Sequence, residues 1–402
     1  MSDFFQNGVI TTLPILGDHP VEEMEAELRS YAAISKIALL LPALVTEFEG
    51  PAMKKILKQL QGVDYLHQVV VSLDRAERAQ FVEIRDYLRR RLPAVQVVWH
   101  DGPRLQAIYE RLRGEDFPVD MPGKGQSVWM TMGYILAQGD VDGIALHDCD
   151  ITNYERSLLA RLVYPLMSRR ADFEFCKGYY ARVNGRLYGR ATRLFFTPII
   201  RSLKRTVGRL LYLEYLDSFR YPLAGEFAIH SHLAESVRIA PDWGLEISTL
   251  GEVYQNTSLK RICQVELMDS YCHKHQTIDI RKPSTGLVRM VMDISLSLFR
   301  ILTQDGVVLS DAHFRSLQTS YLREAREAVD KYSALAAINR LEYDRHAEIS
   351  AVEAFQKGFR LAVEQFREDP VGTPMIPAWT RIRSAIPDLS AELLDAVRAD
   401  NA

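Results

Sequence analysis

Short apolar runs alternate with amphipathic segments between residues 36 and 150, and this alternation predicts the architecture of the first part of the chain. The apolar runs have the length of buried strands and several are rich in β-branched residues, at 37–41, 67–73, 95–100 and 143–146. The first run is expected to stop at Pro42, which has no N–H for a strand ladder. Segments with helical spacing lie at 50–61, 75–91 and 127–138. Strands that alternate with helices predict an α/β fold with a mostly parallel sheet.

The remainder of the chain has a different pattern. Residues 151–280 mix helices and strands, with extended segments expected at 173–180 and 262–268. Beyond a boundary near 283 the pattern is helical, with helices expected at 287–303, 312–335 and 346–366 and a proline-rich loop at 368–377. We therefore expect a domain at 1–282, with halves at 36–150 and 151–282, followed by a helical C-terminal extension at 283–402.

Composition narrows the class of protein. The 402 residues are 47% hydrophobic and 25% charged, which is ordinary for a globular chain. A net charge of -3 argues against a general nucleic-acid binder. The longest apolar run, at 37–45, is far short of the roughly 20 residues that cross a bilayer. Residues 1–8 lack the pattern of a secretion signal, and the four cysteines form no CxxC pair, so we predict a cytoplasmic protein.

The first candidate for chemistry is Asp148-Cys149-Asp150, which follows the predicted strand at 143–146. Two carboxylates at the C-terminal end of a strand are well placed to hold Mg²⁺ or Mn²⁺ against substrate phosphates. This is the DxD arrangement of nucleotide-sugar enzymes. The same tripeptide also fits two solvated loop carboxylates, and the preceding strand favours the metal site.

A second candidate, Pro122-Gly123-Lys124-Gly125, opens a predicted helix. Glycines allow close approach of the backbone, and a lysine beside a helix N-terminus suits a phosphate. The spacing is not that of a P-loop, and a plain loop with a solvated lysine is the alternative. Further along, His273 and His275 lie in Tyr271-Cys-His-Lys-His275. One histidine could complete a metal site begun by Asp150, although zinc binding or surface histidines also fit.

Basic residues gather between 182 and 209 without any Asp or Glu among them. They are Arg182, Arg186, Arg190, Arg193, Arg201, Lys204, Arg205 and Arg209. Arginine clusters recognise carboxylate and phosphate groups, so the segment predicts a small anionic ligand, with a solvated helix face or an RNA contact as alternatives. Arg190 is favoured because it follows Gly189 in a turn. Glu226 and Glu246 each follow a glycine closely and fit either helix starts or contacts to a sugar.

Eight short motifs occur in an order that is characteristic of one family. They are Leu41-Pro-Ala-Leu44, Pro122-Gly-Lys-Gly125, Asp148-Cys-Asp-Ile151, Lys177-Gly-Tyr-Tyr180, Gly189-Arg-Ala-Thr192, Pro222-Leu-Ala-Gly-Glu226, Trp243-Gly-Leu-Glu246 and His273. From about residue 39 to 276 the chain resembles the glucosyl-3-phosphoglycerate synthases, which are retaining glycosyltransferases. The resemblance implies a GT-A fold, a Rossmann-like nucleotide-sugar-binding domain with a mostly parallel sheet, here with the helical extension. It also suggests a homodimer.

The resemblance implies a role for each matching residue. The donor nucleotide-sugar would be contacted by Pro42, Ala43, Leu44, Glu47, Asp74, Lys124, Asp148 and Cys149. The divalent cation would be held by Asp150 and His273, and the acceptor by Gly189, Arg190, Thr192 and His275. Glu246 would bind the transferred hexose and, with Asp148, form the catalytic centre. Cys149, Tyr271 and His275 depart from the serine, arginine and asparagine of the shorter family members.

The implied reaction is a metal-dependent transfer of glucose from UDP-glucose, or another NDP-glucose, to 3-phosphoglycerate. The product would be a precursor of the compatible solute glucosylglycerate. GDP-mannose as donor or glycerate as acceptor are the nearest alternatives. A sugar nucleotidyltransferase is a more distant one, because its glycine-rich, arginine-containing signature is not found near the N-terminus. The third alternative is a non-catalytic protein that binds UDP-sugars. For the transferase we expect front-face attack rather than double displacement.

Overall fold

The computed structural model describes residues 6, 8–168, 170–241, 244–272 and 285–402. Its core is one mixed β-sheet. In the described residues its strands follow the order β1-β8-β6-β7-β5-β2-β3-β4. They are β1 (Thr11–Leu13), β2 (Ile37–Leu44), β3 (Gln68–Asp74), β4 (Gln96–Trp99), β5 (Gly143–Leu146), β6 (Phe175–Tyr180), β7 (Phe227–His230) and β8 (Ile262–Met268). Only β7 runs antiparallel to its neighbours β5 and β6. The predicted mostly parallel α/β sheet is therefore confirmed.

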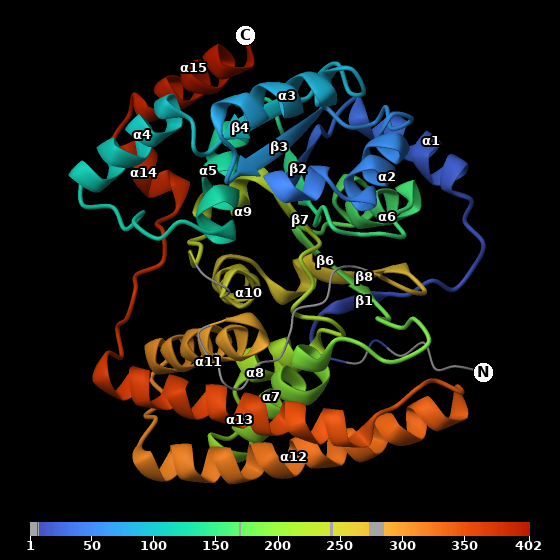
Figure 1. The fold of residues 1–402 in the computed structure, drawn as a ribbon, viewed down its shortest axis with the longest axis vertical. Helices are drawn as coiled ribbons and strands as arrows, with labels where there is room; N and C mark the ends of the chain where they lie inside the picture. The colour runs from blue at the N-terminus through green and yellow to red at the C-terminus, as the bar shows by residue number, and fades with distance from the viewer. Residues whose placement is uncertain (1–5, 7, 169, 242–243, 273–284) are drawn as a thin grey trace.

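Helices cover both faces of the sheet (Figure 1). One face is covered by α1 (Val21–Ala32), α2 (Pro51–Leu60), α3 (Arg78–Arg89) and α6 (Arg156–Met167). The other is covered by α4 (Pro103–Gly114), α5 (Lys124–Ala137) and α9 (Ser231–Ser236). Alternate side chains of β2 enter the two cores, with Leu39 on one side and Leu40 on the other. A strand that is buried on both faces reads as a continuous apolar run, which is why the pattern located it.

The strand β2 continues through Pro42, so the prediction that it stops there is wrong. The carbonyl of Ile37 accepts a hydrogen bond from the amide of His67 on the β3 side. Because backbone groups alternate along a strand, Pro42 faces the β5 side. The pairing of β5 with β2 has already ended at Leu40. A missing N–H at Pro42 therefore removes no hydrogen bond from the ladder.

The remaining helices lie in the second half of the described chain. They are α7 (Thr197–Thr206), α8 (Leu211–Ser218), α10 (Leu245–Asn256), α11 (Gly286–Gln304), α12 (Asp311–Ile338), α13 (Arg345–Glu368), α14 (Trp379–Ala385) and α15 (Leu389–Asn401). Shorter turns are η1 (Val45–Phe48), the π-helix η2 (Ala191–Phe196) and η3 (Leu259–Arg261). The three helices expected after residue 283 correspond to α11, α12 and α13. No helix within the described ranges is long and apolar enough to cross a membrane.

Some elements were not anticipated. Sequence patterns missed α4, although Gly102-Pro103 is a typical helix start, with proline at the first helical position. They also missed β1 and β7, which are only three and four residues long. The predicted helix at 75–91 begins later, at Arg78, because Glu77 and Gln80 form a capping box.

The helices of the C-terminal extension lie in two separate regions of the molecule. Its helices α11, α12 and α13 form a layer with α7 and α8 on one side of the molecule (Figure 1). The chain then returns to the sheet, where α15 packs against α4, α5 and β4. The domain division at 282/283 stays a prediction, because the boundary lies outside the described residues.

Asn401, next to the C-terminus, closes the edge of the sheet. Its side-chain amide accepts a hydrogen bond from Val97 N at 3.0 Å and donates one to Val97 O at 2.7 Å. Val97 belongs to β4, the last strand in the order. Because an edge strand presents unpaired backbone groups, this amide acts as a short substitute for a further strand.

We expect Asn401→Ala to lower the free energy of unfolding by about 2 kcal/mol, because it leaves a buried N–H and a buried C=O of Val97 without partners. Urea denaturation followed by circular dichroism measures the change. Asn339→Ala is the matched control, since Asn339 is exposed and donates only to Leu335 O within its own helix end. Equal stabilities of the two variants would contradict the role of Asn401.

Candidate functional site

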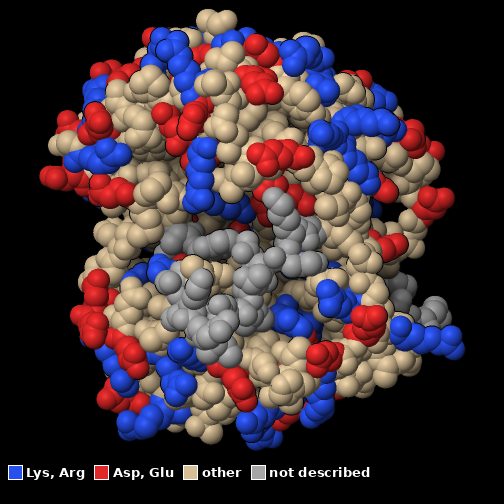
Figure 2. All heavy atoms as spheres, viewed as in Figure 1, with Lys and Arg blue, Asp and Glu red and all other residues tan. Residues whose placement is uncertain are grey.

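A cavity of about 940 Å³ lies where β2, β3 and β5 end, between the sheet and α11. Open parallel sheets bind their ligands at this position, beyond the carboxyl ends of the strands. Figure 2 shows basic and acidic side chains above and below the middle of this face. The cavity is lined by Pro42, Ala43, Leu44, Glu47, Asp74, Lys124, Asp148, Cys149, Asp150, Gly189, Arg190, Thr192 and Glu246, all of which the sequence proposed. The other two proposed residues, His273 and His275, lie outside the described residues.

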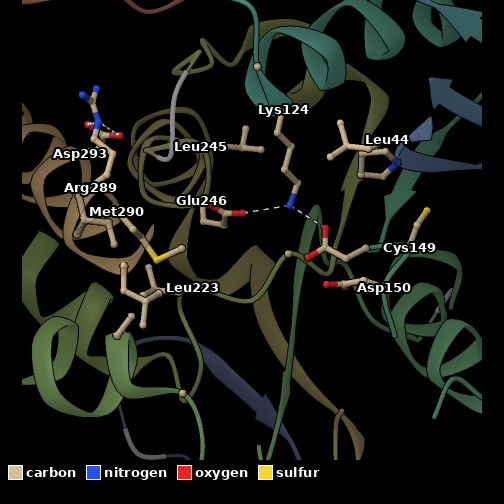
Figure 3. A pocket seen from close by; sticks show the side chains of 18 of the residues that line it. Leu44, Lys124, Cys149, Asp150, Leu223, Leu245, Glu246, Arg289, Met290 and Asp293 are labelled. Atoms are coloured by element: carbon tan, nitrogen blue, oxygen red, sulfur yellow. Dashed lines mark hydrogen bonds and ion pairs between the residues drawn. The ribbon is translucent and has the colours of Figure 1, made fainter. Parts of the chain in front are cut away.

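Lys124 links two carboxylates at the centre of this cavity. Its Nζ lies 2.7 Å from Asp148 Oδ1 and 3.4 Å from Glu246 Oε1 (Figure 3). Burial alone would lower the pKa of the Lys124 ammonium, but Asp148 and Glu246 outweigh it and hold that pKa above its ordinary value. The lysine is therefore a stable cation, as a group that stabilises a phosphate must be.

Three separate segments bring these charges together. Lys124 is the first residue of α5, which begins before the predicted start at residue 127, and Asp148 follows β5. Glu246 lies in the first turn of α10, so its predicted position at a helix start is confirmed. A carboxylate there is favoured by the partial positive charge of the helix N-terminus.

Two glycines permit the close approach of these segments. A Cβ at Gly125 would lie 2.0 Å from the carbonyl oxygen of Ala240, and one at Gly225 would lie 2.4 Å from Asp148 Oδ2. Both distances are far below a van der Waals contact. Close packing thus explains both glycines, because Gly125 lies against the backbone of Ala240 and Gly225 lies against the carboxylate of Asp148.

The described residues supply only part of the set of ligands that a divalent cation needs. Asp148 and Asp150 present carboxylate oxygens at the end of β5, the ligands that Mg²⁺ and Mn²⁺ prefer. No group of three His, Cys, Asp or Glu side chains that could hold a metal occurs among the residues described. Because Asp148 is paired with Lys124, Asp150 is the better candidate ligand. The predicted partner His273 is not described, so this pairing stays a prediction.

Cys149 borders the cavity but is buried, with 3% of the residue exposed. Figure 3 shows its sulfur directed away from Lys124 and Asp150. Burial, with the neighbouring Asp148 and Asp150 charges, raises the pKa of the thiol well above its ordinary value. A contact from Cys149 to a donor would therefore come from its backbone.

Glu226 is not a helix-start residue, so that interpretation is wrong. It precedes β7, is fully buried and accepts hydrogen bonds from Tyr180 at 2.7 Å and Tyr271 at 2.5 Å. It does not line the cavity, so it is not placed to touch a sugar either. Burial and the Asp148 charge raise its pKa, while the two phenol hydrogen bonds act in the opposite direction. Glu226 instead joins the stacked rings of Tyr180 and Tyr271 behind the site.

Lys177 is a buried residue of the site region to which the sequence assigned no role. Its Nζ donates to the carbonyl of Ala224, beside Gly225. Burial lowers its pKa to about 8, although Glu246 and Glu226 act in the opposite direction. The sequence signal that could have identified Lys177 is its position as the single charged residue of an apolar strand, because a lysine is almost never fully buried unless it is paired.

The basic segment at 182–209 divides into two parts. Arg182, Arg186 and Arg190 line the cavity. On α7, by contrast, Lys204 pairs with Glu214 at 2.6 Å and Arg205 with Glu324 at 2.7 Å. For α7 the alternative of an ordinary charged helix face is therefore correct, and only the first part remains a candidate anion site.

A mostly parallel sheet, with acidic side chains after a central strand and a lysine opposite them, defines a glycosyltransferase of the GT-A type. The chain is 54% identical over 401 residues to glucosyl-3-phosphoglycerate synthase of Persephonella marina, covering 100% of this chain and 99% of that protein. It therefore belongs to the glucosyl-3-phosphoglycerate synthases.

Further comparisons agree. The synthase of Methanococcoides burtonii is 36% identical over 404 residues, which cover 99% of this chain and 98% of that protein. A crystal structure of the Mycobacterium tuberculosis synthase with Mn²⁺, UDP-glucose and phosphoglyceric acid aligns with a TM-score of 0.55 at 25% identity, over 75% of this chain and 89% of that one. No family model matches the sequence.

We expect Gly225→Ala to lower the rate of glycosyl transfer about a hundredfold, because the new methyl group displaces the Asp148 carboxylate and a small misplacement at a reacting centre has effects of this size. Steady-state kinetics, with circular dichroism to verify the fold, measure the change. Gly114→Ala is the control, since a Cβ there meets no atom within 4 Å. Full activity of Gly225→Ala would show that Asp148 need not be held in this position.

Proposed function

We propose that this chain transfers glucose from UDP-glucose, or another NDP-glucose, to 3-phospho-D-glycerate with retention of configuration. The observation that carries the proposal is the full-length similarity to proteins named glucosyl-3-phosphoglycerate synthase. The cavity supports it, because it combines a lysine with two carboxylates at the strand ends and arginines on the opposite wall. The product would serve as a precursor of glucosylglycerate.

The donor would occupy the part of the cavity next to the sheet. Pro42, Ala43 and Leu44 end β2 there, and Asp74 ends β3, where it accepts a hydrogen bond from Ser127 at 3.2 Å. These residues would contact the base and ribose, with Glu47 beside them on η1. Asp150 and His273 would hold the cation, which when bound neutralises charge on the departing diphosphate. Lys124 would add a second positive charge, since its ammonium lies in the cavity beside Asp148.

The acceptor would occupy the opposite wall of the cavity. Gly189, Arg190 and Thr192 come from the turn before η2 and from its first residues. Gly189 has a φ of +71°, a left-handed conformation that favours glycine. A guanidinium beside this turn suits the carboxylate and phosphate of a small acid. His275 was also predicted as an acceptor contact, and it lies outside the described residues.

Front-face attack fits the ion pair at the centre. The bond from the anomeric carbon to the diphosphate oxygen breaks, a bond to the acceptor hydroxyl oxygen forms, and the hydroxyl proton passes to the leaving phosphate. Glu246 is already engaged with Lys124, so we assign it to a sugar hydroxyl rather than to covalent attack. Asp148 would act with it by holding Lys124 in place.

The reducing cytoplasm is the proposed compartment, since all four cysteines are free thiols in the structure. A homodimer is proposed from the family resemblance, with the C-terminal extension as the candidate contact. Size-exclusion chromatography with light scattering tests it.

The direct test of the proposed function is a product assay with Mg²⁺ or Mn²⁺. UDP-, ADP- and GDP-glucose and GDP-mannose are each paired with 3-phosphoglycerate and with glycerate. We expect a phosphorylated glucoside that disappears with EDTA and falls about a hundredfold or more in Asp150→Ala, because the metal loses a ligand. Asp140→Ala is the control, since Asp140 is partly exposed and does not line the cavity. Formation of an NDP-sugar, or no transfer from any donor, would contradict the proposal.

A second prediction concerns Glu246. We expect Glu246→Gln to lose at least about tenfold in turnover without accumulating a glycosyl-enzyme, because it removes a charge beside the reacting sugar rather than a nucleophile. Rapid-quench mass spectrometry of the intact protein measures the adduct. A covalent glucosyl adduct on Glu246 of the unaltered enzyme would favour double displacement instead.

A further inference from the structure

Glu348, on α13 of the C-terminal extension, pairs with Arg190 of the cavity wall and with the nearby Arg193, which does not line the cavity. Glu348 is 4% exposed, and its Oε1 lies 2.7 Å from Arg190 Nε while its Oε2 lies 2.9 Å from Arg193. Arg190 immediately precedes the π-helix η2 and lines the cavity, and Arg193 is the third residue of η2. A residue separated from Arg190 by 158 positions thus determines where its side chain lies.

The second arginine of this cluster fixes the backbone of the same turn. Arg193 Nε donates to the carbonyl of Tyr188 at 2.7 Å, immediately before Gly189. Glu348 therefore holds the turn in two ways, directly through the Arg190 side chain and indirectly through Arg193. An α-helix interrupted by π-helical geometry is frequently found at functional sites, which agrees with this placement.

Other contacts dock the same part of the extension on the cavity wall. Glu342, in the connection between α12 and α13, donates its amide to Gly185 O at 2.9 Å. Tyr321 on α12 donates its hydroxyl to Leu194 O at 3.0 Å. The segment at 185–194 is thus held at both ends, with Glu348 between them.

The charges of this cluster do not cancel. One carboxylate faces two guanidinium groups, which leaves an excess positive charge at the wall. Glu348 engages the Nε of Arg190, and within the described part of the chain Arg190 has no other hydrogen bond or ion pair. The two terminal nitrogens of Arg190 keep the geometry for a two-pronged contact with a phosphate or carboxylate.

We propose that Glu348 is a positioning residue for the acceptor, which acts by orienting Arg190 and the turn at Gly189. The inference rests on the proposed function and extends it, because it assigns the C-terminal extension a part in recognising the anionic acceptor. Glu348 itself does not line the cavity, so its effect on an acceptor would pass through Arg190.

The test is the acceptor dependence of Glu348→Gln, which keeps the size of the side chain but removes its charge. We expect its KM for 3-phosphoglycerate to rise about tenfold or more, with the KM for UDP-glucose within about twofold of the original, because only the acceptor contact is misplaced. Glu324→Gln is the matched control. Glu324 is 5% exposed on α12 and pairs with Arg205 of α7 at 2.7 Å, away from the cavity. It should change neither KM.

A double-variant cycle separates positioning from a general structural effect. In an Arg190→Ala background, Glu348→Gln should raise the KM for 3-phosphoglycerate no further. Glu348→Asp keeps the charge but shortens the reach, so we expect an intermediate KM, and it supplies the test if Glu348→Gln folds poorly. Equal acceptor KM values for the Glu348 variants, Glu324→Gln and the unaltered enzyme would overturn the inference. Absence of transfer by the unaltered enzyme would instead overturn the proposed function.

Discussion

The arrangement of the cavity depends on one interaction, in which the ammonium group of Lys124 lies between the carboxylates of Asp148 and Glu246. A partly buried lysine loses some of its hydration, and opposite charges compensate for that loss. Here they come from two segments that follow Lys124 by 24 and 122 positions. The ends of β5, α5 and α10 must therefore meet at one point. A divalent cation and a diphosphate would add to a network of charges that is already organised.

Close backbone packing makes that meeting possible. Gly125 lets α5 start directly against the carbonyl of Ala240, and Gly225 lets the segment before β7 pass beside Asp148. Behind it, the Lys177 ammonium binds the carbonyl of Ala224, so the same segment is held from both sides. These contacts, all within the chain, fix the position of the segment beside Asp148.

The C-terminal extension balances charge as well as covering surface. The segment at 182–209 is basic throughout, yet the chain has a net charge of -3. Buried glutamates on α12 and α13 offset part of this positive charge, with Glu324 opposite Arg205 and Glu348 opposite Arg190. Burial strengthens such pairs because the surrounding dielectric is low. The extension and the wall of the cavity that carries Arg190 are therefore parts of one electrostatic unit.

The chain by itself determined the α/β class, the central strands and part of the cavity lining. The class and the strands follow from apolar runs buried on two faces. Lys124, Asp148 and Asp150 follow from local motifs of glycine, lysine and carboxylate, whereas Glu47 and Thr192 were implied by the family resemblance. Only the tertiary structure decided that β2 passes through Pro42, that Glu226 joins two tyrosines, and that Glu348 holds Arg190. Each depends on a partner distant in sequence or on where a neighbouring strand ends, and no local pattern contains that information.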